Sequence, residues 1–125
     1  MRLVVFFTII LLSLACSGPK SEVLDPNGLY DLMYTKNSLQ LIDVRTAQEF
    51  QSGHLREALL IDLFSSEYHR RIETLNKSQP IAVYCAVGQR SLRVFEELKE
   101  KGFEEVYHLK GGIELWKQEG KPIVY

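Results

Sequence analysis

The chain has 125 residues and a formal net charge of −1, with 15 Lys and Arg against 16 Asp and Glu. This balance excludes the strongly basic surfaces that bind nucleic acid or anionic membranes, so we expect no nucleic-acid partner. When the apolar N-terminal segment is set aside, about 100 residues remain, which is enough for one small domain with a single core.

The first 15 residues have the pattern of a secretory signal peptide. Arg2 supplies a positive charge, residues 3–14 are almost all apolar, and Ala15 is a small residue before a cleavage point. The apolar run is shorter than the about 20 residues that a membrane-spanning helix needs. We therefore expect residues 1–15 to be removed and to take no part in the fold.

Cys16 follows the apolar run directly, and a short polar tether completes residues 16–20. This arrangement resembles a bacterial lipoprotein signal, in which the cysteine is lipidated and becomes the mature N-terminus. The sequence departs from that signal at Ser13, where leucine is usual, and residues 13–15 also fit ordinary cleavage for secretion. The resemblance predicts a lipid-anchored protein of the bacterial cell envelope, outside the cytoplasm; a soluble periplasmic or secreted protein is the alternative.

Residues 21–125 alternate between helix and strand patterns. Asp25 and Pro26 predict a helix start, because aspartate caps helices and proline suits the first helical position. Thr46 and Glu49 have the spacing of a capping box that opens a second helix. Short apolar runs predict strands over residues 39–44, 58–61, 81–84 and 106–109, and further helices are expected over 68–75, from near 91 to 102, and after 112. Strands that alternate with helices indicate a parallel sheet covered on both faces, with sites beyond the carboxyl ends of the strands.

The segment from Tyr84 to Ser91 is the strongest functional signal. An apolar strand ends at Cys85, and Arg90 is the last residue before the expected helix. Inward-facing N–H groups of such a loop and the positive end of the helix would favour a thiolate, and the Arg90 guanidinium would suit an oxyanion. The alternative is that Cys85 is a small buried hydrophobic residue at a strand end.

The chain has two cysteines, and a lipidated Cys16 would leave Cys85 without a partner for an internal disulfide. A lone thiol in an oxidising compartment needs a reason to persist. Catalysis is one such reason and burial is the other.

Three blocks of the sequence resemble the rhodanese-like domain family of sulfurtransferases. The resemblance covers residues 21–125 and implies a single small α/β domain with a central parallel β-sheet and helices on both faces. The blocks are the cysteine loop Cys85–Arg90, the upstream segment Asp43-Val-Arg45, Glu49-Phe50 and Gly53-His54-Leu55, and the glycine pair Gly111-Gly112 with Trp116.

The resemblance implies that Cys85 carries a sulfane sulfur as a persulfide, from a donor such as thiosulfate or a persulfide to a thiol acceptor. A thioredoxin-like protein would suit as acceptor, no cofactor is required, and the domain is expected to be a monomer. The residues implied to bind the donor are Ala86, Val87, Gly88, Gln89 and Arg90.

The sequence departs from the family pattern at several positions. Ala86 stands where a basic or polar residue is frequent, and Val87 follows it, so the mouth of the site is less polar. Such a mouth would weaken the binding of a small charged donor, or would suit an apolar or protein-bound one. Arg56-Glu57-Ala58 and Asp62 also depart from the pattern, in turns away from the loop.

Several polar residues are expected to support the structure. Asp43 and Arg45 are predicted to form an internal ion pair, because a carboxylate at a buried strand end must be compensated. His54 is predicted to be structural, since sulfur transfer from a thiolate needs no general base. His69 and His108 lack metal-ligand spacing, so no metal site is predicted.

Three other functions are alternatives to sulfur transfer. Phosphatase and arsenate reductase loops resemble this one, but the four residues between Cys85 and Arg90 are one fewer and leave less room for a tetrahedral phosphate. A non-enzymatic sulfur or redox carrier or sensor, tethered to the membrane, usually goes with a missing cysteine. Independent thiol–disulfide exchange is disfavoured because the chain has no Cys-x-x-Cys pair.

Overall fold

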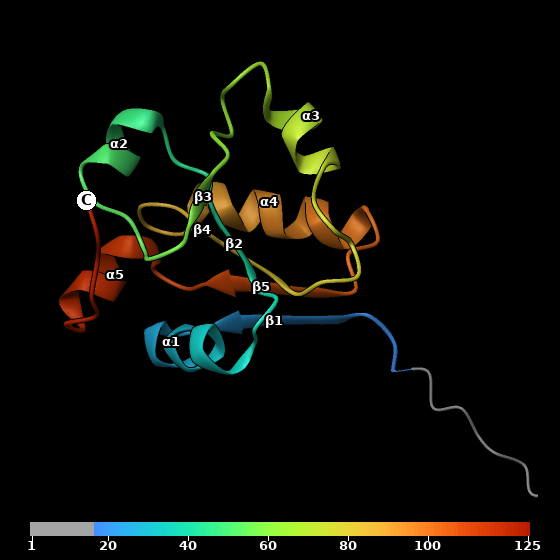
Figure 1. Ribbon diagram of the computed structural model, residues 1–125, viewed down its shortest axis with the longest axis horizontal. Helices are drawn as coiled ribbons and strands as arrows, with labels where there is room; N and C mark the ends of the chain where they lie inside the picture. Colours follow the sequence, from blue (N-terminus) through green and yellow to red (C-terminus); the bar gives the residue numbers. More distant parts are fainter. Residues whose placement is uncertain (1–16) are drawn as a thin grey trace, which may run out of the picture.

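The computed structural model describes residues 17–125, so the predicted signal peptide and the predicted lipidation site Cys16 lie outside the described residues. Within these residues, five parallel strands form one sheet in the order β1-β5-β4-β2-β3, and five helices accompany it (Figure 1). No helix in the described part of the chain is long and apolar enough to cross a membrane. The strands are β1 (Lys20–Leu24), β2 (Gln40–Asp43), β3 (Leu59–Leu60), β4 (Ile81–Tyr84) and β5 (Glu105–Leu109). The helices are α1 (Pro26–Thr35), α2 (Ala47–Gln51), α3 (Tyr68–Glu73), α4 (Gln89–Glu100) and α5 (Gly112–Gln118).

The helices begin where local capping signals predict. The Asp25 carboxylate accepts a hydrogen bond from the backbone N–H of Gly28 at 2.7 Å and starts α1. Thr46 and Glu49 form the reciprocal capping box of α2. Each cap satisfies backbone N–H groups that have no partner inside the helix.

The central strand β4 is fully buried and divides the core into two parts. Because side chains alternate along a strand, Ile81, Val83 and Cys85 face α3 and α4, while Ala82 and Tyr84 face α1 and α5. Figure 1 shows the two helix pairs on opposite sides of the sheet. The predicted α/β class, with a parallel sheet between two helical layers, is confirmed.

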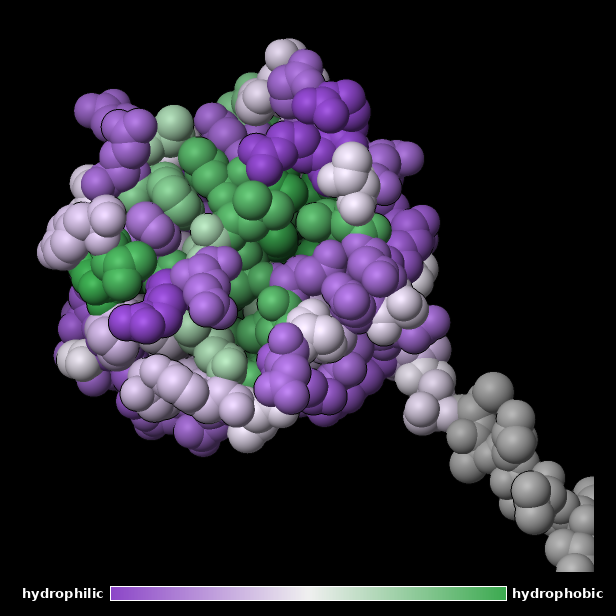
Figure 2. All heavy atoms as spheres, viewed as in Figure 1, coloured by the Kyte–Doolittle hydropathy of each residue, from purple (hydrophilic) through white to green (hydrophobic). Residues whose placement is uncertain are grey.

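The edges of the sheet differ from the prediction. Strand β1 was not expected: it begins at Lys20, within the predicted tether, and pairs along its whole length with β5. Its side chains are mostly exposed, so it lacks the apolar run that marks a buried strand. The expected buried strand over 58–61 is only the two-residue edge strand β3, and Leu59 is 46% exposed. Figure 2 shows apolar side chains gathered on the face where Figure 1 places β2 and β3.

Helix α4 begins at Gln89, two residues earlier than the pattern suggested. Arg90 therefore lies in the first turn of the helix and not in the preceding loop. Gly88 is the N-cap residue with φ +103°, a backbone conformation that side-chain-bearing residues rarely adopt. This left-handed residue completes the turn in a very short connection, so α4 starts directly beside Cys85.

Candidate active site

Cys85 lies at the carboxyl end of β4, beneath the first turn of α4. Its Sγ accepts hydrogen bonds from the backbone N–H of Gly88 at 3.1 Å and of Ser91 at 3.4 Å. The Ser91 hydroxyl is a third donor, with Oγ 3.3 Å from Sγ. The sulfur therefore sits in a ring of donors at the positive end of a helix.

These donors decide the ionisation of Cys85. Burial raises the pKa of the thiol, because a charged sulfur loses its hydration. The hydrogen bonds from Ser91, Gly88 and Val87 act in the other direction and together hold the pKa below its usual value. The site favours a thiolate, which is the nucleophilic form of cysteine.

The active loop is held by the start of α5. The Cys85 carbonyl accepts a hydrogen bond from the N–H of Ile113 at 2.9 Å, and the Ala86 carbonyl accepts one from the N–H of Glu114 at 3.1 Å. Both carbonyls are thereby turned towards α5 and away from the sulfur. Gly112 lies against them with φ +60°, and a Cβ there would come within 2.4 Å of the Ala86 oxygen. The predicted turn at Gly111-Gly112 thus allows α5 to approach the loop backbone.

We expect Gly112→Ala to destabilise the domain more than Gly120→Ala. Both glycines have positive φ, but a Cβ at Gly120 would meet nothing within 4 Å, so that variant measures backbone strain alone. The strain costs about 1–2 kcal/mol, and the clash at Gly112 adds about 1–3 kcal/mol. Urea unfolding of both variants measures the difference, and equal losses would contradict the close contact of α5 with the loop.

The Arg90 guanidinium makes a two-point ion pair that the sequence did not reveal. Its Nη1 and Nη2 donate to the two Glu49 carboxylate oxygens at 2.9 and 2.7 Å. The guanidinium that the sequence predicts to suit an oxyanion is therefore already engaged by Glu49 in this structure. The sequence marks Glu49 as a capping residue of α2 and as part of the upstream family block, and the structure shows that it also joins α2 to α4 across 41 residues of sequence. The hydrogen bonds from Arg90 lower the pKa of Glu49 to about 2.

This pKa predicts how the ion pair responds to acid. Because the folded pKa of Glu49 lies below its ordinary value of 4.5, its stabilisation is present above about pH 4.5 and is lost as the pH falls towards 2. Glu49→Gln keeps a capping side chain but removes the charge. We expect it to lower the unfolding free energy by about 0.5–1 kcal/mol at pH 7, as for a partly exposed pair.

Thermal unfolding of Glu49→Gln and of the parent protein from pH 7 to pH 2.5 would test this. The two melting temperatures should converge in the acid range. Glu67→Gln is the control, because it removes the more exposed Glu67–Arg70 pair at the protein surface. A constant gap between the parent and Glu49→Gln at every pH would contradict the assignment.

The upstream block forms a buried polar network below the loop. The Arg45 guanidinium donates to both oxygens of the Asp43 carboxylate at 2.7–3.0 Å and to the Gly53 carbonyl at 2.7 Å. Asp43 is fully buried and Arg45 is 4% exposed, so the structure contains the internal ion pair expected from the sequence. His54 stacks on Phe50 at 3.7 Å and contacts the Phe50 carbonyl through Nδ1 at 3.1 Å, which is consistent with a structural residue.

Ser91 and His108 form a polar pair at the site that no sequence pattern predicts. The sequence marks Ser91 only as the start of a helix and gives His108 no metal-ligand spacing. The structure brings Ser91 Oγ to 2.8 Å from His108 Nε2, and both side chains are buried. Among the described residues, no group of His, Cys, Asp and Glu side chains could hold a metal ion.

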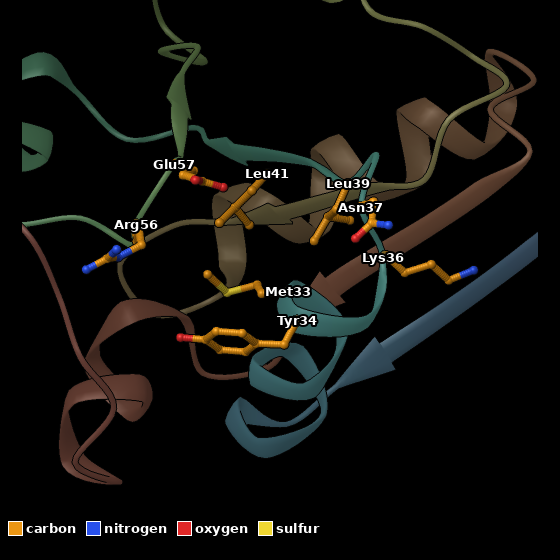
Figure 3. Close-up of a pocket in the computed structure, with 8 residues that line it drawn as sticks. All are labelled: Met33, Tyr34, Lys36, Asn37, Leu39, Leu41, Arg56 and Glu57. Carbon is orange, nitrogen blue, oxygen red and sulfur yellow. The ribbon is translucent and has the colours of Figure 1, made fainter.

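The surroundings of the site are partly apolar. Val87 lies within the active loop and is 60% exposed, and Leu92, in the first turns of α4, is 46% exposed. A separate pocket of about 350 Å³ lies between α1, β2 and the segment before β3, lined by Met33, Leu41 and Arg56 among others (Figure 3). That pocket includes no residue of the active loop.

The fold and the site together define a parallel α/β domain with a buried, hydrogen-bonded cysteine at the end of its central strand. The family model described as "Rhodanese-like domain" matches residues 25–119. The chain belongs to the rhodanese-like domain family, as its sequence motifs predict.

Relatives include enzymes named as sulfurtransferases. The thiosulfate sulfurtransferase GlpE of Coxiella burnetii is 35% identical over 82 residues, which cover 66% of this chain and 75% of that protein. The uncharacterized protein YqhL of Bacillus subtilis is 39% identical over 77 residues, covering 62% of this chain and 60% of YqhL, less than two thirds of its length. A rhodanese-related protein from Thermoplasma volcanium has a similar structure, with a TM-score of 0.72, 28% identity, and coverage of 82% of this chain and 96% of that one.

Proposed function

We propose that this protein is a sulfurtransferase in which Cys85 carries the transferred sulfur. The observation that supports this most directly is the set of three donors around Cys85 Sγ, at 3.1–3.4 Å. They stabilise a thiolate at a fixed position, and a thiolate is the form that attacks sulfur. Membership of the rhodanese-like family supports the same chemistry.

The proposed reaction has two displacement steps. The Cys85 thiolate attacks the outer sulfur of thiosulfate, the donor's S–S bond breaks, and sulfite leaves with the electron pair. Cys85 then bears a persulfide. An acceptor thiolate attacks the terminal sulfur of this persulfide, the new S–S bond on Cys85 breaks, and the Cys85 thiolate is regenerated. No external oxidant or reductant is consumed.

The active loop is proposed to bind the donor through its backbone. Gln89 and Arg90 are the first two residues of α4, so their N–H groups have no partner within the helix and are suited to an anion. Ala86, Val87 and Gly88 complete the proposed donor site. Since Glu49 engages the Arg90 guanidinium, Arg90 would act mainly by holding the first turn of α4 in place.

The residues around the opening of the site would suit an apolar or protein-bound persulfide as a sulfur donor, as well as thiosulfate. Arg90 is the one charged residue from Cys85 to Ser91, and its charge is compensated by Glu49. The exposed Val87 and Leu92 side chains offer apolar contacts to a larger partner. A thioredoxin-like protein remains our proposed acceptor.

Lipidation of Cys16 remains part of the proposal. An apolar run ends at Cys16, and only residues 17–19 separate this cysteine from the first strand, β1. An anchored protein would hold the sulfur site close to a membrane, outside the cytoplasm.

Mass spectrometry of the intact protein tests the proposed function. We expect a gain of about 32 Da, one sulfur atom, after incubation with thiosulfate or with a small organic persulfide. A thiol acceptor should remove the added mass. A protein that gains no sulfur from either donor would contradict the proposal, while a gain from the persulfide alone would identify the donor class.

A further inference from the structure

A chain of three buried polar groups runs from the sulfur into the core. Ser91 Oγ lies 3.3 Å from Cys85 Sγ and 2.8 Å from His108 Nε2. The three side chains come from the end of β4, the first turn of α4 and β5, and each is at most 5% exposed. His108 pairs in register with Val83, two residues before Cys85, so His108 and Cys85 face the same side of the sheet.

The Ser91 hydroxyl has one hydrogen but more than one acceptor within reach. Cys85 Sγ and the Gly88 carbonyl each lie 3.3 Å from its oxygen. His108 Nε2 is a third acceptor if that nitrogen carries no hydrogen. The tautomer of His108 therefore decides whether the imidazole competes for this hydrogen with the sulfur and the Gly88 carbonyl; of those two, a Cys85 thiolate is the stronger acceptor because it is charged.

The surroundings of His108 favour a hydrogen on Nε2. Burial lowers the pKa of His108, so the ring is neutral near pH 7 and carries one N–H. Nδ1 is buried and has no hydrogen-bond partner in the described part of the chain, and orphaned buried N–H groups are rarer than orphaned acceptors. With the hydrogen on Nε2, the imidazole donates to Ser91 Oγ.

We propose that His108 is a positioning residue whose Nε2–H donates to Ser91 Oγ and thereby directs the Ser91 hydroxyl hydrogen to Cys85 Sγ. The order of donation is imidazole to hydroxyl to thiolate. The inference rests on the proposed function, because it concerns the thiolate that would attack the donor. It assigns to a residue of β5 a part in preparing a nucleophile at the end of β4.

The titration of Cys85 in the full chain tests this chain of donors. A Cys16→Ala parent leaves Cys85 as the single cysteine, so that ultraviolet thiolate absorbance against pH reports its acidity. We expect His108→Leu to weaken the acid dissociation of Cys85 about tenfold, the scale of one lost hydrogen bond. His108→Gln, which carries an amide N–H near the Nε2 position, should stay within about threefold of the parent.

A double-mutant cycle separates this role from general packing. Ser91→Ala should also weaken the acid dissociation, and adding His108→Leu to Ser91→Ala should change it no further, because His108 acts through the hydroxyl. The charged residues near Cys85, which are Arg90, Glu49 and Asp43, are the same in every variant, so they do not cause differences in its acid dissociation. An equal effect of His108→Leu with and without the Ser91 hydroxyl would overturn the proposal, as would no effect in the parent.

Nitrogen NMR of the ¹⁵N-histidine-labelled parent measures the His108 tautomer directly in the unaltered site. His108→Gln identifies the His108 signals, and the proposal requires the Nε2–H tautomer at neutral pH. The Nδ1–H tautomer would overturn it. Sulfur loading of the same parent is measured separately by mass. If the variants change the acid dissociation of Cys85 as expected but the parent gains no sulfur, the proposed function is contradicted and this inference is not.

Discussion

Cys85→Ser is expected to abolish the uptake of sulfur. The parent should gain about 32 Da with thiosulfate or a small persulfide, and the serine variant should gain nothing. The physical reason is that a serine hydroxyl is not ionised near pH 7, whereas the Cys85 thiol has its pKa held below the usual value by the Ser91, Gly88 and Val87 hydrogen bonds, against the effect of burial. Intact mass and release of sulfite measure the two products of the first step.

The second cysteine supplies the matched control. Cys16→Ala removes a thiol that lies outside the described residues and should leave the mass gain unchanged. Serine is close in size to cysteine, so Cys85→Ser should keep the fold, which circular dichroism checks. If the folded serine variant still takes up labile sulfur and transfers it, Cys85 is not the carrier.

Arg45→Met is expected to give the largest loss of stability among single changes at the polar network. The Asp43 carboxylate is fully buried, and Arg45 provides its ion-pair partner. Removing the guanidinium leaves a buried charge without compensation, which costs about 3–5 kcal/mol. Total stability of a small domain is about 5–15 kcal/mol, so the variant should unfold at much lower urea concentration.

Arg70→Met is the control for this prediction. Arg70 pairs with Glu67 at 2.6 Å, a distance as short as that of the buried pair, but both side chains are more than half exposed. Its removal should cost at most about 1 kcal/mol, because water screens the charges in either state. Replacing Asp43 by leucine in the Arg45→Met background should recover part of the lost stability. Equal costs for the two arginine changes would mean that burial does not govern the Asp43–Arg45 pair.

Elements with local signals could be predicted from the amino-acid sequence alone. The start of α1 could be predicted from Asp25 and Pro26, because a cap and its N–H partner lie within one turn. The buried strand β4 could be predicted from its apolar run, since both of its faces are covered. The position of Cys85 at the point where this strand gives way to a helix followed from the change of pattern, and family motifs around it agreed.

Features that depend on contacts between distant segments could be found only in the folded structure. Strand β1 exists because β5 offers it a partner, and its exposed side chains give no local signal. The ion pair between Arg90 and Glu49 forms only because α2 and α4 lie side by side, and no sequence pattern predicts that these two helices are neighbours. The contact between Ser91 and His108 depends on the register of β5 beside β4. Side-chain hydrogen bonds act over about 3 Å, so which groups surround a reactive sulfur is fixed only when the sheet has brought its strands together.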